Sequence, residues 1–265
     1  GLDETHGIGG MYLHSVDEGN MKRCADCHTS DPHTAGGTAA GLVASHPTLS
    51  CQVCHIPAIA RVRTTKTEWY WATAGDSNRT PIDVGDGRFD YDKKKGNFVW
   101  ANNVRPTLRR HDGKWNKMYI GVNDTYTGTP SPTDPVVLAE PSVSKDPAQA
   151  GGAMIYPFKK MIGNQPADTV NMQFIVPHLF GSKGGPNPYW ARFDWDLALQ
   201  DGAAYTEQTY SGTHGFIDTV MYLTVNHEVA PKEMALGTTG CTDCHGAAAG
   251  LDWSELGRTD PLGGS

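Results

Sequence analysis

The chain has no cysteine outside a single repeated pattern, Cys-x-x-Cys-His. All six cysteines among its 265 residues belong to this pattern, which occurs three times. No thiol is left over for a disulfide framework or for a lone catalytic nucleophile, so disulfide-knot proteins and cysteine proteases are excluded. The motifs are Cys24/Cys27 with His28, Cys51/Cys54 with His55, and Cys241/Cys244 with His245.

Long apolar runs and excess positive charge are also missing. No stretch approaches the roughly 18 to 20 apolar residues of a membrane span, and even 216–225 is interrupted by Asp218 and Thr224. The 22 basic and 29 acidic side chains give a net charge of −7, the wrong sign for binding phosphates. We therefore expect no membrane span and no nucleic-acid partner.

The chain starts at Gly1 without a leader, so we expect either a removed secretory signal or a piece of a longer chain.

Cys-x-x-Cys-His is the attachment signature of haem c. The two thiols add to the porphyrin as thioethers, and a helical turn places the histidine under the iron. Zinc bound by the first two cysteine pairs is an alternative, but zinc requires no histidine after each pair and leaves the third pair alone. A thioredoxin-like redox pair would explain one motif and not three. The sequence therefore predicts three haem c groups, with His28, His55 and His245 as iron ligands.

Each iron also needs a sixth ligand, and histidine is in surplus. A methionine ligand would raise the reduction potential, whereas bis-histidine ligation leaves it lower; the surplus favours bis-histidine. His14 and His46 precede the first two motifs, and His33 follows the first. His227 precedes the third motif, and we predict these four as distal ligands. The eight histidines outside the motifs are His6, His14, His33, His46, His111, His178, His214 and His227.

Glycine and proline punctuate the rest of the chain. They make up 31 and 17 residues, which predicts extensive irregular loops with short helices. The fold class that we expect is mainly α with extensive irregular loops and little β structure. Apolar residues at helical spacing predict helices after 191 and around 216–225, with a short helix over 232–236. A short extended piece is expected at Phe98–Trp100, and another at Lys117–Val122.

These patterns divide the chain into three segments, which we expect to form one compact unit. They are a two-haem segment (1–57), a haem-free, loop-rich segment that packs on the haems (58–190) and a helical segment with the third haem (191–265). The pair Arg109-Arg110 is a candidate for holding haem propionates through charge-assisted hydrogen bonds.

Several long runs resemble the octahaem tetrathionate reductase type of multihaem cytochrome c. They are CQVCHIPAIAR (51–61), WYWATAG (69–75), IYPFKKMIGNQPADTVN (155–171), PHLFG (177–181) and NHEVAPKEMALGTTGCTDCHG (226–246) followed by LDWSELGRTDP. The resemblance is to the C-terminal, three-haem part of that family. It implies a mostly helical, loop-rich multihaem scaffold in which histidines ligate haems attached elsewhere in the chain. It also implies that the substrate-reducing haem, which has a lysine ligand in the family, is absent; Lys22 does not map onto that lysine.

These observations favour an electron-transfer cytochrome with three bis-histidine haems, working in the periplasm or outside the cell, where haem attachment occurs. An enzyme reducing tetrathionate, nitrite or hydroxylamine is an alternative that rests on the resemblance alone. A third alternative is a subunit of a homo-oligomer, filament or larger conduit, in which a surplus histidine caps an iron of another chain. The expected partners are other redox proteins or further haem-bearing chains.

Overall fold

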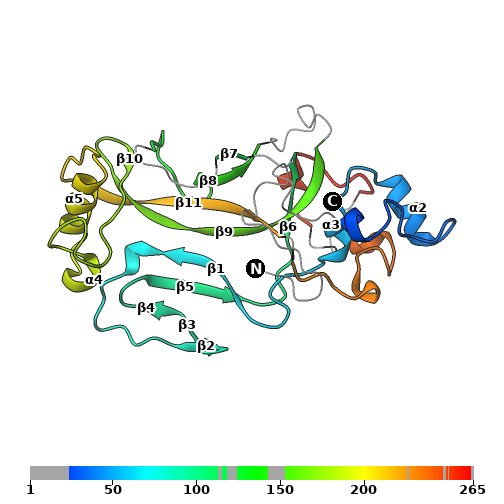
Figure 1. The fold of residues 1–265 in the computed structure, drawn as a ribbon, viewed down its shortest axis with the longest axis horizontal. Helices are drawn as coiled ribbons and strands as arrows, with labels where there is room; N and C mark the ends of the chain where they lie inside the picture. Colours follow the sequence, from blue (N-terminus) through cyan, green and yellow to red (C-terminus); the bar gives the residue numbers. More distant parts are fainter. Residues whose placement is uncertain are drawn as a thin grey trace.

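A nine-stranded mixed sheet forms the centre of the fold (Figure 1). The structure is a computed structural model that describes residues 24–112, 115–117, 124–142, 153–225, 227–246, 249 and 251–263. Its strands are β1 (Thr65–Tyr70), β2 (Asp83–Gly85), β3 (Arg88–Phe89), β4 (Tyr91–Asp92), β5 (Gly96–Ala101), β6 (Thr107–His111), β7 (Trp115–Lys117), β8 (Val136–Pro141), β9 (Met154–Asp168), β10 (Gln173–Phe174) and β11 (His214–Thr224). Its helices are α1 (Cys24–Cys27), α2 (Thr38–Ser45), α3 (Cys51–His55), α4 (Tyr189–Arg192) and α5 (Trp195–Tyr205), with 3-10 turns η2 (Trp71–Thr73), η4 (Lys232–Met234), η5 (Cys241–Asp243) and η7 (Trp253–Leu256).

The long strand β9 organises the sheet. The strand order is β4-β5-β1-β9-β11-β8-β7, and β6 and β10 also pair with β9. β9 runs parallel to β1 and antiparallel to β11, with which it pairs continuously from His214↔Asp168 to Thr224↔Phe158. Close approach to β1 requires Gly163, because a Cβ there would collide with the Trp69 carbonyl. β2 and β3 form a separate two-stranded ribbon.

The expectation of a mainly α fold with little β structure was wrong. The region 216–225, predicted as a helix, lies almost entirely in β11. Its apolar residues fit a helical period, but a short apolar run fits a strand equally well. The run is rich in β-branched and aromatic residues, including Ile217, Val220 and Tyr222, and β9 supplies a complete set of backbone partners. The pairing partner, 46 to 66 residues away in sequence, therefore decided the conformation.

Of the other predicted helices and extended pieces, some agree with the structure and some agree only in part. The helix expected after 191 is α5, capped by the Asp194 side chain, which accepts a hydrogen bond from the Leu197 amide. Phe98–Trp100 lies within β5. The segment 232–236 forms only the 3-10 turn η4, and of Lys117–Val122 only Lys117, in β7, is among the described residues.

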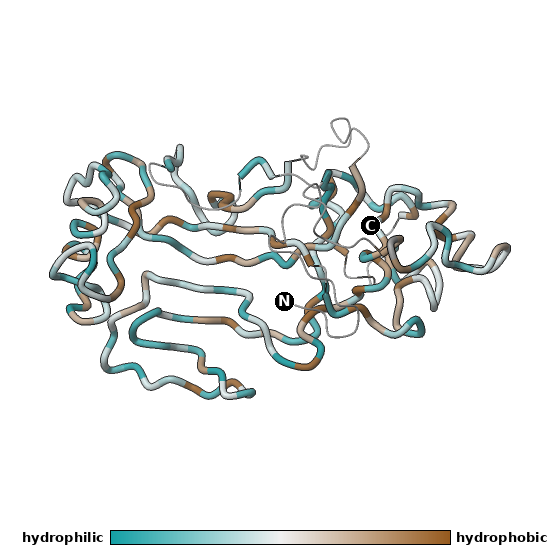
Figure 2. The backbone as a smooth tube through the Cα atoms, viewed as in Figure 1, coloured by the Kyte–Doolittle hydropathy of each residue, from teal (hydrophilic) through white to brown (hydrophobic). Residues whose placement is uncertain are grey.

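The motif-bearing elements gather at one end of the sheet. In Figure 1, α1, α2 and α3 and the orange and red C-terminal segments lie at the right, whereas α4 and α5 lie at the left. Hydrophobic stretches are short and spread along the chain (Figure 2), and the core is accordingly divided into several small clusters. One cluster joins Val53 of α3 to Leu108 of β6 and Ile155 of β9, and so fixes the second motif to the sheet. No helix in the described ranges is long and apolar enough to cross a bilayer.

An aromatic cluster surrounds a lysine between β1 and β5. The Lys66 ammonium lies 3.9 Å from the ring centre of Trp69 and 3.7 Å from that of Phe98. Burial is the main reason why the pKa of Lys66 is lowered to about 8, and the nearby Lys95 lowers it further. The amine therefore loses its proton at a lower pH in the folded chain than in the unfolded chain.

This gives a prediction for stability against pH. Between pH 8 and about 10.4, the unfolded chain keeps the Lys66 proton that the folded chain has released, so Lys66 makes the free energy of unfolding rise with pH. In Lys66→Met we expect this rise to shrink by about 1–2 kcal/mol relative to wild type, after allowance for partial solvation. Urea unfolding at pH 7.5 and pH 10 measures the difference. Exposed Lys183→Met is the control, and an equal pH response in both variants would contradict the assignment.

Candidate functional site

Each Cys-x-x-Cys-His motif forms one helical turn. The His28 amide donates to the Cys24 carbonyl at 2.8 Å, and the His245 amide donates to the Cys241 carbonyl at 2.9 Å. The second motif is the whole of α3. Residues three and four apart on a helical turn share a face, so both thiols and the histidine of each motif lie on one side. The six thiols are all exposed or half-buried.

The three motifs lie close together, with the second in the middle. The Cys24 and Cys51 thiols are hydrogen bonded, which lowers the pKa of Cys51 to about 6 and raises that of Cys24. Burial raises the pKa of Cys54 to about 11, and neighbouring Cys244 adds to the increase. Motifs that are 27 and 190 positions apart in sequence therefore share one region of the molecule.

The second motif is held by backbone hydrogen bonds from distant segments. The amides of Ala230 and Leu236, which precede the third motif, donate to the carbonyls of His55 and Cys54 at 2.8 and 2.9 Å. On the other side, the Ser50 amide donates to the Ile155 carbonyl in β9 at 2.9 Å. The second motif thus joins the sheet to the third motif.

Two of the predicted distal histidines face a motif histidine. The ring centres of His33 and His55 are 6.1 Å apart, with the rings 6° from parallel. Burial, together with nearby His33 and His28, lowers the pKa of His55. The ring centres of His46 and His245 are also 6.1 Å apart, with an angle of 39° between the planes.

Second partners hold the rings of His245 and His46. The His245 Nδ1–H donates to Asp260 at 2.7 Å, and the Trp253 ring stacks on His245 at 5.0 Å. Hydrogen bonds from the Gly246 amide and from His245 lower the pKa of Asp260 to about 2. The His46 Nδ1–H donates to the Leu42 carbonyl at 2.9 Å. In both rings Nδ1 is engaged and Nε2 is left for a metal, as is usual for metal-binding histidines.

Asp260 and Trp253 were not identified as site residues from the sequence. Neither belongs to a motif, and Asp260 follows His245 by 15 positions in a Gly- and Pro-rich tail. Their place beside His245 depends on how that tail folds back, for which the sequence carries no local signal.

The other two predicted distal ligands are not paired in this way. His227 lies at the surface, with half of its side chain exposed, and its Nδ1 is 3.8 Å from Glu228. The Glu228 carboxylate accepts hydrogen bonds from the amides of Ala60 and Arg61, just after the second motif. His14 lies outside the described residues.

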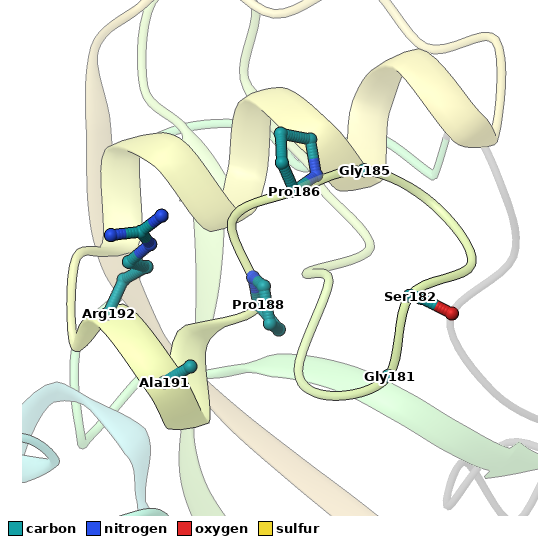
Figure 3. A pocket seen from close by; sticks show the side chains of 7 residues that line it. All are labelled: Gly181, Ser182, Gly185, Pro186, Pro188, Ala191 and Arg192. Carbon is teal, nitrogen blue, oxygen red and sulfur yellow. The ribbon is translucent and has the colours of Figure 1, made fainter.

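Two further features bear on a binding site away from the motifs: clusters of metal-binding side chains, and cavities. Within the described residues, no three His, Cys, Asp or Glu side chains gather into a cluster that could hold a bare metal ion. An open cavity of about 550 Å³ lies between the loop 181–188 and α4, at the opposite end of the sheet from the motifs (Figures 1 and 3). It is lined by Gly181, Ser182, Gly185, Pro186, Pro188, Ala191 and Arg192, so no motif residue contributes to it.

Three thiol pairs on helical turns, each followed by a histidine and two of them faced by a second histidine, define a multihaem c-type cytochrome. The chain belongs to the bacterial cytochrome c family, whose model matches residues 66–248. Members of this family bind haem c covalently, and the chemistry is haem-based electron transfer or reduction. The thiols and imidazoles described above fit such a group.

A solved structure supports the same class. The octahaem cytochrome c from Shewanella oneidensis is similar over 90% of this chain, with 37% sequence identity and a TM-score of 0.74. The chain spans 52% of the length of that protein. No curated protein matches the chain. The resemblance seen in the sequence is therefore confirmed at the level of a multihaem cytochrome c close to the octahaem type.

Proposed function

We propose that the chain is an electron-transfer cytochrome carrying three covalently bound haems c. The carrying observation is the clustering of the motifs: the Cys51 thiol is hydrogen bonded to the Cys24 thiol, and the Leu236 amide, just before the third motif, donates to the Cys54 carbonyl at 2.9 Å. Haems attached at these thiols would be neighbours, with the second between the other two. Each haem iron, when bound, supplies a one-electron ferric–ferrous couple. The protein residues hold the haems in sequence and fill the axial positions.

The two histidine pairs support bis-histidine ligation of two irons. Two imidazoles bound through nitrogen to one metal have ring centres about 6.3 Å apart, from two metal–nitrogen distances of about 2 Å and about 1.1–1.2 Å within each ring. His33 with His55, and His46 with His245, are each at 6.1 Å. We assign them as the axial pairs of the haems at the second and third motifs. For the haem at the first motif His28 is the proximal ligand, and His14 and His227 remain the distal candidates.

This arrangement favours a carrier over a reductase, because a reducing haem needs one axial position open to substrate. We place the protein in an extracytoplasmic respiratory chain, in the periplasm or outside the cell, since haem thioethers are formed there. Its partners are then other redox proteins or further haem-bearing chains.

A conduit subunit is the second candidate, and the exposure of His227 favours it. A half-exposed histidine that pairs with no motif among the described residues is placed to cap an iron of a neighbouring chain, in a homo-oligomer or filament. In that case His227→Ala reduces the assembly size measured by light scattering; an unchanged size removes this candidate.

Haem counting and ligand binding test the main proposal. We expect intact-mass analysis and the pyridine haemochrome assay of holo-protein to give three haems per chain. Added cyanide or nitrite should leave the Soret band of the assigned low-spin haems unchanged. Fewer than three haems contradicts the count. A fully loaded wild-type protein that binds nitrite and reduces nitrite, hydroxylamine or tetrathionate contradicts the carrier function in favour of an enzyme.

A further inference from the structure

Arg110 is a buried guanidinium without a counter-charge among the residues that the structure describes. It is 4% exposed, its Nε has no hydrogen-bond partner, and no acidic side chain within the described residues forms an ion pair with it. A buried charge is costly unless it is paired and hydrogen bonded. Burial, and then the charge of Arg258, lower the pKa of Arg110. The site therefore needs an anion.

The neighbouring arginines are already engaged. Arg109 lies 3.9 Å from Glu255 and 4.1 Å from the ring centre of Tyr222. Arg105 donates to the Asp243 carbonyl, in the third motif, at 2.5 Å. The Nε atoms of Arg105 and Arg109 are also unpartnered, but each of those guanidinium groups has another partner. Among these three arginines, only Arg110 has neither an acidic side chain nor a carbonyl partner within the described residues.

Arg110 lies on the side of β6 that faces the motifs. It pairs in register with Ile155 of β9, and side chains of directly paired residues project to the same face. Ile155 packs with Val53 of α3 and Leu256 of η7. The guanidinium is thus on the face that contacts the second motif and the turn beside the third.

Arg258 adds a second positive charge at the rim of this region. It is exposed and interacts electrostatically with Arg110. Its amide donates to the carbonyl of Trp253 at 3.2 Å, and the Trp253 ring stacks on His245. Arg110 inside and Arg258 at the surface thus place two positive charges near the ring that stacks on the third motif histidine.

We propose that Arg110 and Arg258 clamp a propionate of the haem attached at Cys241 and Cys244. A haem propionate is a carboxylate fixed to the edge of the macrocycle, and an arginine fork binds carboxylates through two parallel hydrogen bonds. The inference rests on the proposed attachment of that haem. The sequence indicated Arg109 and Arg110 as the residues that hold propionates. The proposed clamp instead pairs Arg110 with Arg258 and assigns the propionate to the haem at the third motif.

Spectroelectrochemical titration of the holo-protein tests the clamp. Removing a buried positive charge near a haem favours the ferric form. In Arg110→Met we expect the equilibrium of one haem to shift about tenfold toward ferric, a fall of about 59 mV in its midpoint for a one-electron couple. Arg110→Lys keeps the charge and should retain most of the wild-type midpoint. Arg192→Met, an exposed arginine on α4 with the same charge change, should shift nothing.

The second variant, Arg258→Met, covers the case in which Arg110→Met fails to load haem. It should lower the midpoint of the same haem by a smaller amount. In a His46→Ala background the third haem is marked as high-spin, and the shift must appear in that component.

Three results would overturn the proposed clamp. The first is equal haem midpoints in Arg110→Met and Arg192→Met. The second is an unchanged midpoint in Arg258→Met, in the case that Arg110→Met does not load haem, and the third is a midpoint shift confined to low-spin haems. A wild-type midpoint that moves when phosphate replaces chloride assigns the site to free anions instead. Loss of haem at Cys241 and Cys244 in wild type, seen by peptide mass, would instead refute the proposed function.

Discussion

Replacing His33 with alanine is expected to convert one of the three proposed haems from low-spin to high-spin. His33 and His55 are 6.1 Å apart between ring centres, the separation of two imidazoles on one metal, so the variant leaves the iron at the second motif with one protein ligand. The high-spin ferric signal should account for one third of the iron by electron paramagnetic resonance. Cyanide should then bind stoichiometrically to that haem.

Imidazole rescue separates lost ligation from a general structural defect. Millimolar imidazole should return the His33→Ala spectrum to low-spin, because the small molecule fills the vacated position. His214→Ala is the matched control: His214 lies at the start of β11 next to Tyr210, away from the motifs, and should leave all haems low-spin. A wholly low-spin His33→Ala protein with full haem content would refute the assignment of His33 as a ligand.

Replacing Asp168 with alanine is expected to destabilise the fold by about 3–5 kcal/mol. Asp168 ends β9 and is fully buried. Its carboxylate accepts hydrogen bonds from the amides of Val170, Asn171 and Ser211 at 2.9, 2.9 and 2.6 Å, and from the side chains of Asn171 and Ser211. Alanine leaves these donors without an acceptor, both in the turn that follows β9 and in the segment just before β11. Urea or thermal unfolding of the holo-protein measures the loss.

The pH dependence of this effect has a definite sign. Burial would raise the pKa of Asp168, but hydrogen bonds from Asn171, Ser211 and Val170 hold it below its usual value. The stabilisation is therefore present above about pH 3.9, the unfolded-state pKa, and is lost as the pH falls through the lower folded-state pKa. The gap between wild type and Asp168→Asn should narrow in that acidic range. Exposed Glu207→Gln is the control for charge, and a loss as small as the control's would contradict the role given to Asp168.

The cofactor class could be inferred from the sequence because its signal is local. Two thiols and a histidine at positions i, i+3 and i+4 need only one helical turn to share a face, and the turn forms in all three motifs. His33 could be proposed as a ligand for a similar reason, since it lies close in sequence to the first motif. Its partner His55, in contrast, belongs to the second motif, and the pairing required the chain to fold.

The sheet could not be inferred in this way. Strand β11 carries an apolar pattern that is compatible with a helix, and β9 contains Pro157 and Pro166, which argue locally against a strand interior. Both strands form because each supplies the other's backbone hydrogen bonds along eleven paired positions. The division of the chain at 57 and 190 stays a prediction, although the last segment holds β11 as well as α5.

The sequence by itself determined the chemistry of this protein: six cysteines in three Cys-x-x-Cys-His motifs specify haem c attachment, because attachment depends on residues within five positions of one another. Tertiary structure alone decided which distant groups meet there. Asp260 and Trp253 reach His245, and Arg258 reaches Arg110, because the C-terminal tail folds back against the third motif and β6. Contacts between residues so far apart depend on long-range pairing and packing, which no local pattern encodes.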